Sequence, residues 1–218
     1  MAKREPKQER SQRTRAVLVQ AAAEVFAESG FAGASVNKIA NRAGLTLGAL
    51  YFHFENKEAV AREIVRMQPS FATPVDGAEG LQRAVDITLI WAYGLLRNPV
   101  LVAGARLVAE QGDFMGPEEN SHRQWAAILA DALRSAQARR EVRSGVDVEA
   151  VARLVVNAST GAQLHAFAES GPGRGDLPYR IEEMWRCLLP ALAVPSAIKR
   201  LEFGEGRARP DADAPMHA

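Results

Sequence analysis

The sequence lacks the residues from which disulfide scaffolds and zinc sites are built. Cys187 is its single cysteine, so neither a disulfide within the chain nor a multi-cysteine zinc site can form. The four histidines are scattered, and no two have the spacing of a metal-binding pair. We therefore expect no metal and no cofactor. Because Cys187 stands in an apolar helical pattern, we predict a buried, unreactive thiol.

Long apolar runs and catalytic signatures are also absent. No apolar stretch reaches the ~18 residues of a membrane span, and the N-terminus is charged where a secretory signal would be apolar. These absences predict a cytoplasmic protein with no membrane partner. No Gly-x-Ser-x-Gly occurs, and the glycine-rich segment 171–176 lacks the Lys-Ser/Thr of a phosphate loop. We expect no catalytic residues, although a pair of buried carboxylates would be invisible here and leaves an enzyme as the alternative from another class.

Strand-like alternation is missing as well, and the apolar residues repeat at the helical spacings of three and four. The pattern predicts an all-α fold of about nine helices. They are expected over residues 11–30, 36–42, 47–52, 57–67, 81–96, 100–109, 118–140, 148–168 and 181–192.

The net charge of +1 hides an uneven distribution. Residues 1–66 hold eleven Lys and Arg against seven Asp and Glu, whereas the remainder holds sixteen against nineteen. Most of the positive excess lies in the first fifteen residues. This basic arm predicts a local contact with a polyanion, and a solvated, frayed terminus is the alternative.

Residues 35–57 have the pattern of two short helices joined by a tight turn at 43–45. Ser35 and Thr46 are good N-cap residues, and Gly44 suits a helix end. Because a helix of about two turns is unstable alone in water, the flanking helices must hold it. That arrangement presents the second short helix as a rigid probe for the major groove of DNA.

The residues around this probe have the chemistry that DNA contact requires. Small residues allow close approach of the backbone, hydroxyls and free amides at helix N-termini suit phosphates or bases, and longer polar side chains donate to phosphates. The alternative is a small helical core with solvated polar residues. The predicted DNA-contacting residues are Arg13, Ser35, Asn37, Lys38, Thr46, Leu47, Gly48, Ala49, Tyr51, His53 and Lys57.

The stretch from Arg13 to Glu63 resembles the DNA-binding domain of the TetR family of repressors. The resemblance rests on Gly-Ala-Leu-Tyr-Phe-His-Phe at 48–54, followed by Asn-Lys-Glu at 56–58. It implies a homodimer on double-stranded operator DNA and a divergent C-terminal domain that binds a small molecule. We accordingly expect a three-helix helix-turn-helix domain with its basic arm at 1–56, linked by a fourth helix into a helical ligand-binding and dimerisation domain at 57–202. The Gly/Pro/charge-rich end, 203–218, predicts a disordered tail.

The chain departs from many relatives at Leu47, where they have Lys or Arg. A basic residue there could pair with guanine edges, whereas Leu47 could touch a thymine methyl. We therefore expect the operator to differ from the relatives' consensus at that position.

The C-terminal part resembles the γ-butyrolactone receptor-like subgroup of actinobacteria such as Streptomyces. The similar segments are 98–107, Trp125 and 147–152. The resemblance implies a hormone-like inducer of the γ-butyrolactone, butenolide or furan type and a ligand-pocket role for Trp125. A pocket between helices also needs a few polar groups. The candidates, each with an ordinary core side chain as its alternative, are Gln68, Trp91, Trp125, Ser159, Thr160 and Gln163.

These observations predict a repressor that a small signalling molecule releases from a palindromic operator. Ligand would favour a dimer whose recognition helices no longer match half-sites about one turn (~34 Å) apart. The dimer face is expected on the last long helices, where more apolar surface is present than an amphipathic helix needs, from Trp185, Leu188, Leu189 and Leu192. The alternatives are a pseudo-receptor that answers to an antibiotic, an activator, and a non-specific DNA-binding protein, against which the near-neutral charge argues.

Overall fold

The computed structural model describes residues 7–74, 77–110, 121–171 and 175–208, and within these ranges it contains ten α-helices, two 3₁₀ turns and no strand. The all-α prediction is confirmed. The described residues form two compact units. The first unit comprises 7–68 and 99–110, and the second comprises 69–74, 77–98, 121–171 and 175–208. Over the described residues the chain therefore passes from one unit to the other three times.

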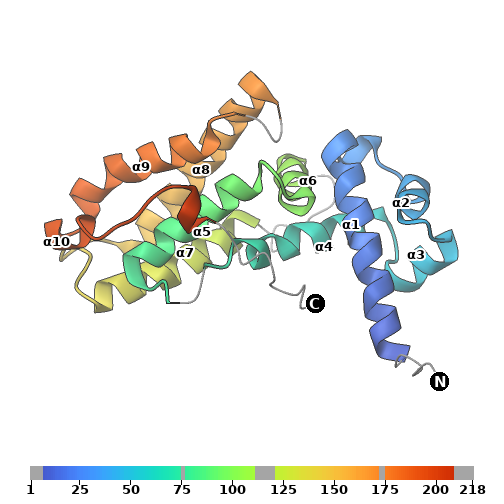
Figure 1. Cartoon of the computed structure of the whole chain (residues 1–218), viewed down its shortest axis with the longest axis horizontal. Helices are drawn as coiled ribbons and strands as arrows, with labels where there is room; N and C mark the ends of the chain where they lie inside the picture. The colour runs from blue at the N-terminus through green and yellow to red at the C-terminus, as the bar shows by residue number, and fades with distance from the viewer. Residues whose placement is uncertain (1–6, 75–76, 111–120, 172–174, 209–218) are drawn as a thin grey trace. The chain divides into compact units, whose positions relative to one another are not determined.

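The first unit is built around a long helix, α1 (Lys7–Gly33), against which α2 (Val36–Ala43) and α6 (Pro99–Ala109) pack (Figure 1). The short helix α3 (Leu47–His53) follows α2, and α4 (Lys57–Met67) contacts both α1 and α6. Its core combines aliphatic side chains such as Leu18, Ile39 and Ile64 with the ring of Phe26. Sequence reasoning ended the DNA-binding domain at 56, whereas the contacts group α4 and α6 with it.

The short helices of this unit begin where the sequence predicted and end within one residue of the predicted positions. The side chains of Ser35, Thr46 and Asn56 each accept a hydrogen bond from the amide three residues on, at 3.2, 3.2 and 2.8 Å. Gly44 ends α2 with a φ of 65°, a left-handed conformation that glycine adopts without strain. Such caps satisfy backbone groups that a helix end leaves without partners. The two short helices are thus fixed locally as well as by packing.

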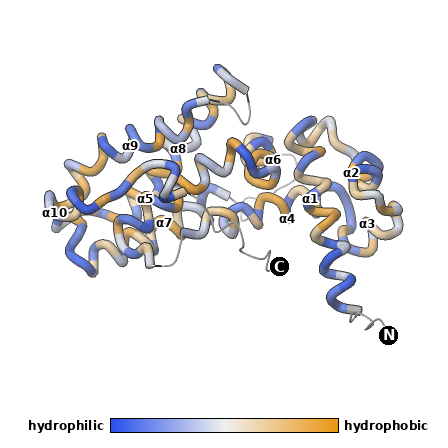
Figure 2. Tube along the Cα trace, viewed as in Figure 1, coloured by the Kyte–Doolittle hydropathy of each residue, from blue (hydrophilic) through white to orange (hydrophobic). Residues whose placement is uncertain are grey.

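The second unit contains α5 (Gly80–Gly94), α7 (Ser121–Ala138), α8 (Val148–Ser170), α9 (Leu177–Leu192), α10 (Pro195–Ile198) and the turn η3 (Glu205–Arg207). The turn η1 (Gln68–Ala72) spans the boundary between the units. Helix α7 packs on α5 and α8, and α9 packs on the same two helices. Most residues of α5 and α6 are apolar (orange in Figure 2), and their buried faces supply much of each unit's core.

The predicted dimer face on α9 is wrong in its residues. Trp185 is fully buried, and its indole N–H donates to the hydroxyl of Thr88 on α5 at 2.8 Å. Leu189 and Leu192 are also buried, and Leu188 is partly so. The apolar stripe is broad because it fills the core of its own unit against α5, α8 and α10.

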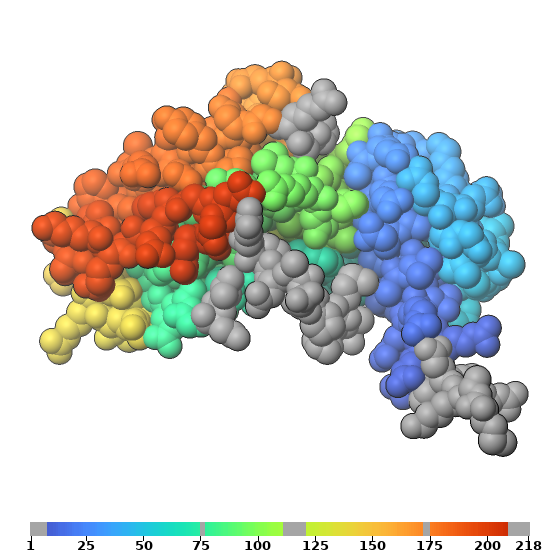
Figure 3. Space-filling view, viewed as in Figure 1, coloured from blue at the N-terminus to red at the C-terminus, as the bar shows by residue number. Residues whose placement is uncertain are grey.

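The C-terminal segment is ordered further than its composition predicted. Residues 203–208 belong to the surface of the second unit (red in Figure 3), and Arg207 forms an ion pair with Asp86, whose carboxylate is buried on α5. The Gln82 amide also bonds both backbone groups of Glu202, at 2.9 and 3.0 Å. Prediction of a disordered tail from residue 203 therefore starts too early. Residues 209–218, like the basic residues 1–6, lie outside the described ranges.

Two further sequence expectations have a structural outcome. Cys187 is exposed on α9, so the predicted burial of its thiol is wrong. No single helix in the described ranges is long and apolar enough to cross a membrane.

Candidate DNA-reading surface and sensor residues

The recognition helix α3 presents an unusually apolar face to solvent. Leu47, Tyr51 and Phe52 are 37%, 53% and 76% exposed, and Gly48 is exposed among them. Leu50, on the opposite side, is fully buried and anchors α3 to the unit. Adjacent exposed apolar side chains on a helix held by such an anchor indicate a surface that meets a partner.

Gly48 has no steric reason to be glycine in this fold. Its φ lies outside the left-handed range, and a Cβ added there would meet only the Thr46 hydroxyl, at an ordinary contact distance of 3.8 Å. The backbone of α3 is therefore bare at one point of its exposed face. A bare backbone allows a flat or bulky partner to come closer than any side chain would permit.

Sequence reasoning missed Phe52. It reads as one more apolar residue of a helical repeat, but it is the most exposed of the large apolar side chains described, and its ring lies edge-on to His53 with centroids 5.0 Å apart. Its neighbours Leu50 and Phe54 already fill the core positions of this stretch. That surplus of apolar residues was the available signal.

The polar residues predicted to contact DNA differ in whether their side chains already form hydrogen bonds within the protein. Asn37 is exposed on α2, and Lys38 is exposed while its ammonium donates to the Gly33 carbonyl at 2.8 Å. Ser35, Thr46 and Ala49 form the caps already described, so their positions at helix starts are fixed. The Lys38 ammonium has a carbonyl and no carboxylate as its partner, so its positive charge is not neutralised.

Lys57, one of the predicted DNA contacts, is held by contacts within the protein. Its ammonium donates to the carbonyls of Phe31 and Ala34, at 2.8 and 3.2 Å, and lies 4.1 Å from the centroid of the Phe31 ring. These contacts tie the start of α4 to the end of α1. Lys57 contributes positive charge to this region, and two of its three ammonium N–H groups are bound within the protein.

The side of the unit that includes the first turns of α1 is basic. Arg13 is exposed there, and Arg15 pairs with Glu63 at 2.7 Å while its guanidinium lies over the Phe54 ring. Burial, reinforced by the positive charge of Arg15, lowers the pKa of His53 below its ordinary value. At neutral pH His53 is therefore a neutral imidazole that donates one hydrogen bond.

The six predicted sensor residues do not fall in one unit. Gln68 belongs to the first unit, is 2% exposed, and packs across Gly104 of α6. The other five lie in the second unit, on three helices. They are Trp91 on α5, Trp125 on α7, and Ser159, Thr160 and Gln163 on α8.

Gln163 is the most informative of these residues. The residue is only 6% exposed, and its side-chain amide has no hydrogen-bond partner among the described residues. Ser159, one turn earlier on the same buried stripe, reaches only the Met184 sulfur, at 3.9 Å. A buried amide without a partner costs about 1–3 kcal/mol. Such a group indicates that a ligand or water completes it.

A groove of about 400 Å³ on the second unit is lined by residues at the start of α5, by Arg139 and Glu141 after α7 and by the segment 197–207, and by none of the sensor candidates. Its arginines and glutamates pair with one another, as Glu141 does with Arg139 and Arg200. Glu141 also accepts the amide of Leu81 at 2.9 Å. The groove is therefore explained by internal pairing. Among the described residues no three His, Cys, Asp or Glu side chains could hold a metal ion together.

Comparison with known protein families places both parts of the chain. Residues 18–64 match the family described as bacterial regulatory proteins, tetR family. Residues 79–195 match the family described as tetracyclin repressor-like, C-terminal domain. The first range contains α2, α3 and most of α4, and therefore the whole exposed apolar face described above.

Individual relatives cover almost the whole chain. The A-factor receptor protein of Streptomyces griseus is 38% identical over 92% of this chain and 71% of its own length. The crystal structure of TylP, a TetR regulator from Streptomyces fradiae, is 36% identical with a TM-score of 0.80, over 89% of this chain and 94% of that one. A γ-butyrolactone receptor described as ArpA-like is 27% identical with a TM-score of 0.66, over 88% and 94%.

Proposed function

The chain belongs to the TetR family and is a DNA-binding transcriptional repressor, and from this premise we propose that it binds a palindromic operator as a homodimer and is released by a small hormone-like inducer. The observation that carries the proposal is the exposed face of α3, with bare backbone at Gly48 between Leu47 and the Tyr51–Phe52 pair. A cytoplasmic location follows from this function, because the operator lies there.

On DNA, the caps and cations would position the protein and the face of α3 would read the bases. Tyr51 and His53 donate to phosphates, while Asn37, Lys38 and Arg13 add contacts from the supporting helices. Lys57 acts through its charge and through the tie to α1. Direct readout falls to Leu47 and Phe52, whose apolar side chains favour thymine methyl groups over guanine edges.

We predict that Leu47→Lys changes which base the protein prefers. A lysine at the head of α3 can pair with guanine O6 and N7, a discrimination of ~1–3 kcal/mol. Binding measured across all four base pairs at each operator position should shift at one position only. The control is Val17→Lys, which adds the same charge at an exposed site on α1 and should strengthen binding to every operator sequence by the same factor. An unchanged preference in Leu47→Lys would remove this residue from readout.

For the sensor, the buried and unpartnered amide of Gln163 supports a ligand that both donates and accepts hydrogen bonds. Trp91 and Trp125 supply ring faces, and Ser159 and Thr160 supply hydroxyls from the same helix as Gln163. Lactone, butenolide and furan-carboxylate hormones all meet this description. The A-factor receptor and the γ-butyrolactone receptor among the relatives favour a lactone. Gln68, in the other unit, couples α4 to α6 in this proposal.

We predict that Gln163→Leu stabilises the protein and removes its response to ligand. Leucine fills similar space without an unsatisfied amide, so the free energy of unfolding should rise by about 1 kcal/mol or more. Operator affinity should stay unchanged, while synthetic γ-butyrolactones no longer release the DNA in a gel-shift titration. Gln137→Leu, at an exposed position on α7, is the control. Release at the wild-type dose would exclude Gln163 from the ligand site.

The homodimer is proposed to form through α8 and α9, with different residues from those the sequence suggested. Leu154 and Leu164 are 49% and 52% exposed, and they share one stripe of α8 with Asn157, Gly161 and Ala168. Tyr179 on α9 is 61% exposed. Two copies of this surface can cover each other by two-fold symmetry. The state of such a dimer would determine whether both α3 helices match their half-sites.

One experiment tests the proposed function directly. The full chain is used to select duplexes from a random pool, and the selected sequence is then compared with bulk DNA in titrations at fixed salt. Selection of a palindrome, bound by two copies per site and preferred by about 10³-fold or more, supports the proposal. Equal affinity for all DNA would instead support a non-specific DNA-binding protein. Release by an antibiotic and by none of the lactones, butenolides or furans would support the pseudo-receptor alternative.

A further inference from the structure

The long helix α1 is broken at Gly30, and two side chains, one on α6 and one directly after it, complete the break. Gly30 has φ 66° and ψ −174°, which interrupts the helical hydrogen bonds on both sides. The carbonyls of Ala27 and Glu28 accept from the Arg106 guanidinium, at 3.0 and 3.2 Å. On the other side, the Phe31 amide donates to the Glu110 carboxylate at 2.8 Å.

This arrangement leaves no space for a side chain at position 30. A Cβ on Gly30 would lie 2.6 Å from a Glu110 carboxylate oxygen and 3.1 Å from the Arg106 Nε. Arg106 lies in the last turn of α6 and Glu110 directly follows this helix, and both side chains contact the break in α1. We call these two side chains and the Gly30 break the latch.

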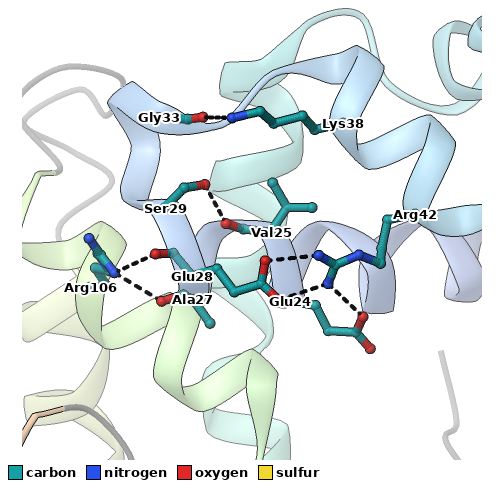
Figure 4. Close-up of polar contacts among 9 residues, drawn as sticks. All are labelled: Glu24, Val25, Ala27, Glu28, Ser29, Gly33, Lys38, Arg42 and Arg106. Carbon is teal, nitrogen blue, oxygen red and sulfur yellow. Dashed lines mark hydrogen bonds and ion pairs between the residues drawn. The ribbon is translucent and has the colours of Figure 1, made fainter.

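From the latch, polar contacts continue to both helices that flank the recognition helix. Glu28 accepts Arg106 through its carbonyl, and its carboxylate pairs with Arg42 of α2 at 2.8 Å (Figure 4). Phe31 donates its amide to Glu110, and its carbonyl accepts the Lys57 ammonium at the start of α4. Helix α3 lies between α2 and α4 in the chain, so both of its ends are connected to the latch.

Helix α6, which carries Arg106 of the latch, is connected along the chain differently from the other helices of the first unit. By contacts α6 belongs to the first unit, but its residues follow α5 of the second unit directly, through 95–98. A displacement of α6 would thus reach the recognition helix through the break in α1. Gln68, packed on Gly104, makes a second attachment between α6 and the end of α4.

We propose that Arg106 and Glu110 are positioning residues for operator recognition. Through the Gly30 break they fix the position of α3 and hold α6, which follows α5 of the second unit in the chain, to the first unit. The inference rests on the proposed function, because it concerns the operator. It assigns the transmission to α1 and its break, in addition to the direct chain connection through α4.

The test compares the full-length wild type with Arg106→Ala and Glu110→Ala on the operator selected by the wild type. A second set of duplexes moves the half-sites one base pair closer or farther apart. We expect each variant to bind the original operator about tenfold more weakly, which corresponds to about 1.4 kcal/mol, and to lose most of its preference for the original spacing. Glu110→Gln keeps an oxygen that accepts the Phe31 amide and should restore both properties.

Thermal unfolding of each variant separates positioning from simple stability. Arg134→Ala, which removes an exposed arginine with two acidic partners on the second unit, is the control and should leave affinity and spacing unchanged. Should Arg106→Ala unfold at the assay temperature, Arg106→Lys provides a milder change at the same position. Latch variants that melt earlier but keep the wild-type spacing preference would overturn the proposal. If the wild type selects no palindrome at all, the proposed function fails, and the positioning role fails with it.

Discussion

Replacing Gly48 by alanine is expected to stabilise the fold slightly and to weaken operator binding. The added methyl group meets nothing closer than 3.8 Å in the protein, and the helical φ of Gly48 suits alanine. Loss of glycine's freedom in the unfolded chain should therefore raise the free energy of unfolding by about 0.4–1 kcal/mol. The same methyl group occupies the space through which DNA approaches the backbone of α3, so operator affinity should fall about tenfold, or about 1.4 kcal/mol.

The effect should grow with the size of the side chain. Gly48→Leu is expected to fold as well as Gly48→Ala and to lose roughly a hundredfold in operator affinity, about 2.7 kcal/mol. Urea unfolding and fluorescence anisotropy with labelled operator measure the two quantities on the same preparations. Gly206→Ala is the matched control, because a Cβ at Gly206 also meets nothing and its φ is not in the left-handed range. Operator affinity that is independent of side-chain size at 48 would show that DNA does not approach here.

Features encoded within a few residues were predictable from the sequence. Ser35, Thr46 and Asn56 mark helix starts because each side chain bonds an amide three residues on, and such a bond depends on local geometry alone. The break at Gly30 was predictable as a helix stop for the same reason. The face of α3 could be located in this way, since its ends are capped locally.

Features that depend on partners distant in sequence were not predictable. Lys57 reads as an exposed cation, but the carbonyl groups left at the end of α1 bind it. Arg106 and Glu110 lie at and just after the end of α6, and the residues that they contact at the break are 78 and 79 positions earlier in the sequence. Periodicity gives the width of an apolar stripe without saying which neighbour covers it, and for this reason α9 was assigned to the wrong contact.

The reassignment of α9 leads to the prediction with the largest expected effect on stability. Trp185→Ala should lower the free energy of unfolding by about 3–5 kcal/mol, because it leaves a cavity at a fully buried position. Thr88→Val keeps the volume but leaves the indole N–H without its acceptor, at a cost of about 1–3 kcal/mol. Urea unfolding of both variants at one fixed protein concentration measures these losses, since the stability of a dimer depends on concentration.

A core role for Trp185 and an interface role affect different equilibria: the first affects unfolding of the protomer, and the second affects dissociation of the dimer. If Trp185 belongs to the core of its own unit, replacing it should lower the stability of the folded protomer. The double-mutant cycle that combines Trp185→Phe and Thr88→Val should then show a coupling energy of about 0.5–3 kcal/mol. Leu154→Glu and Tyr179→Ala, at exposed positions on α8 and α9, should instead promote dissociation of the dimer in sedimentation experiments without lowering the stability of the protomer. If Trp185→Ala leaves the stability of the protomer unchanged, the assignment of Trp185 to the core of its own unit is contradicted, because removal of a fully buried indole must leave a cavity.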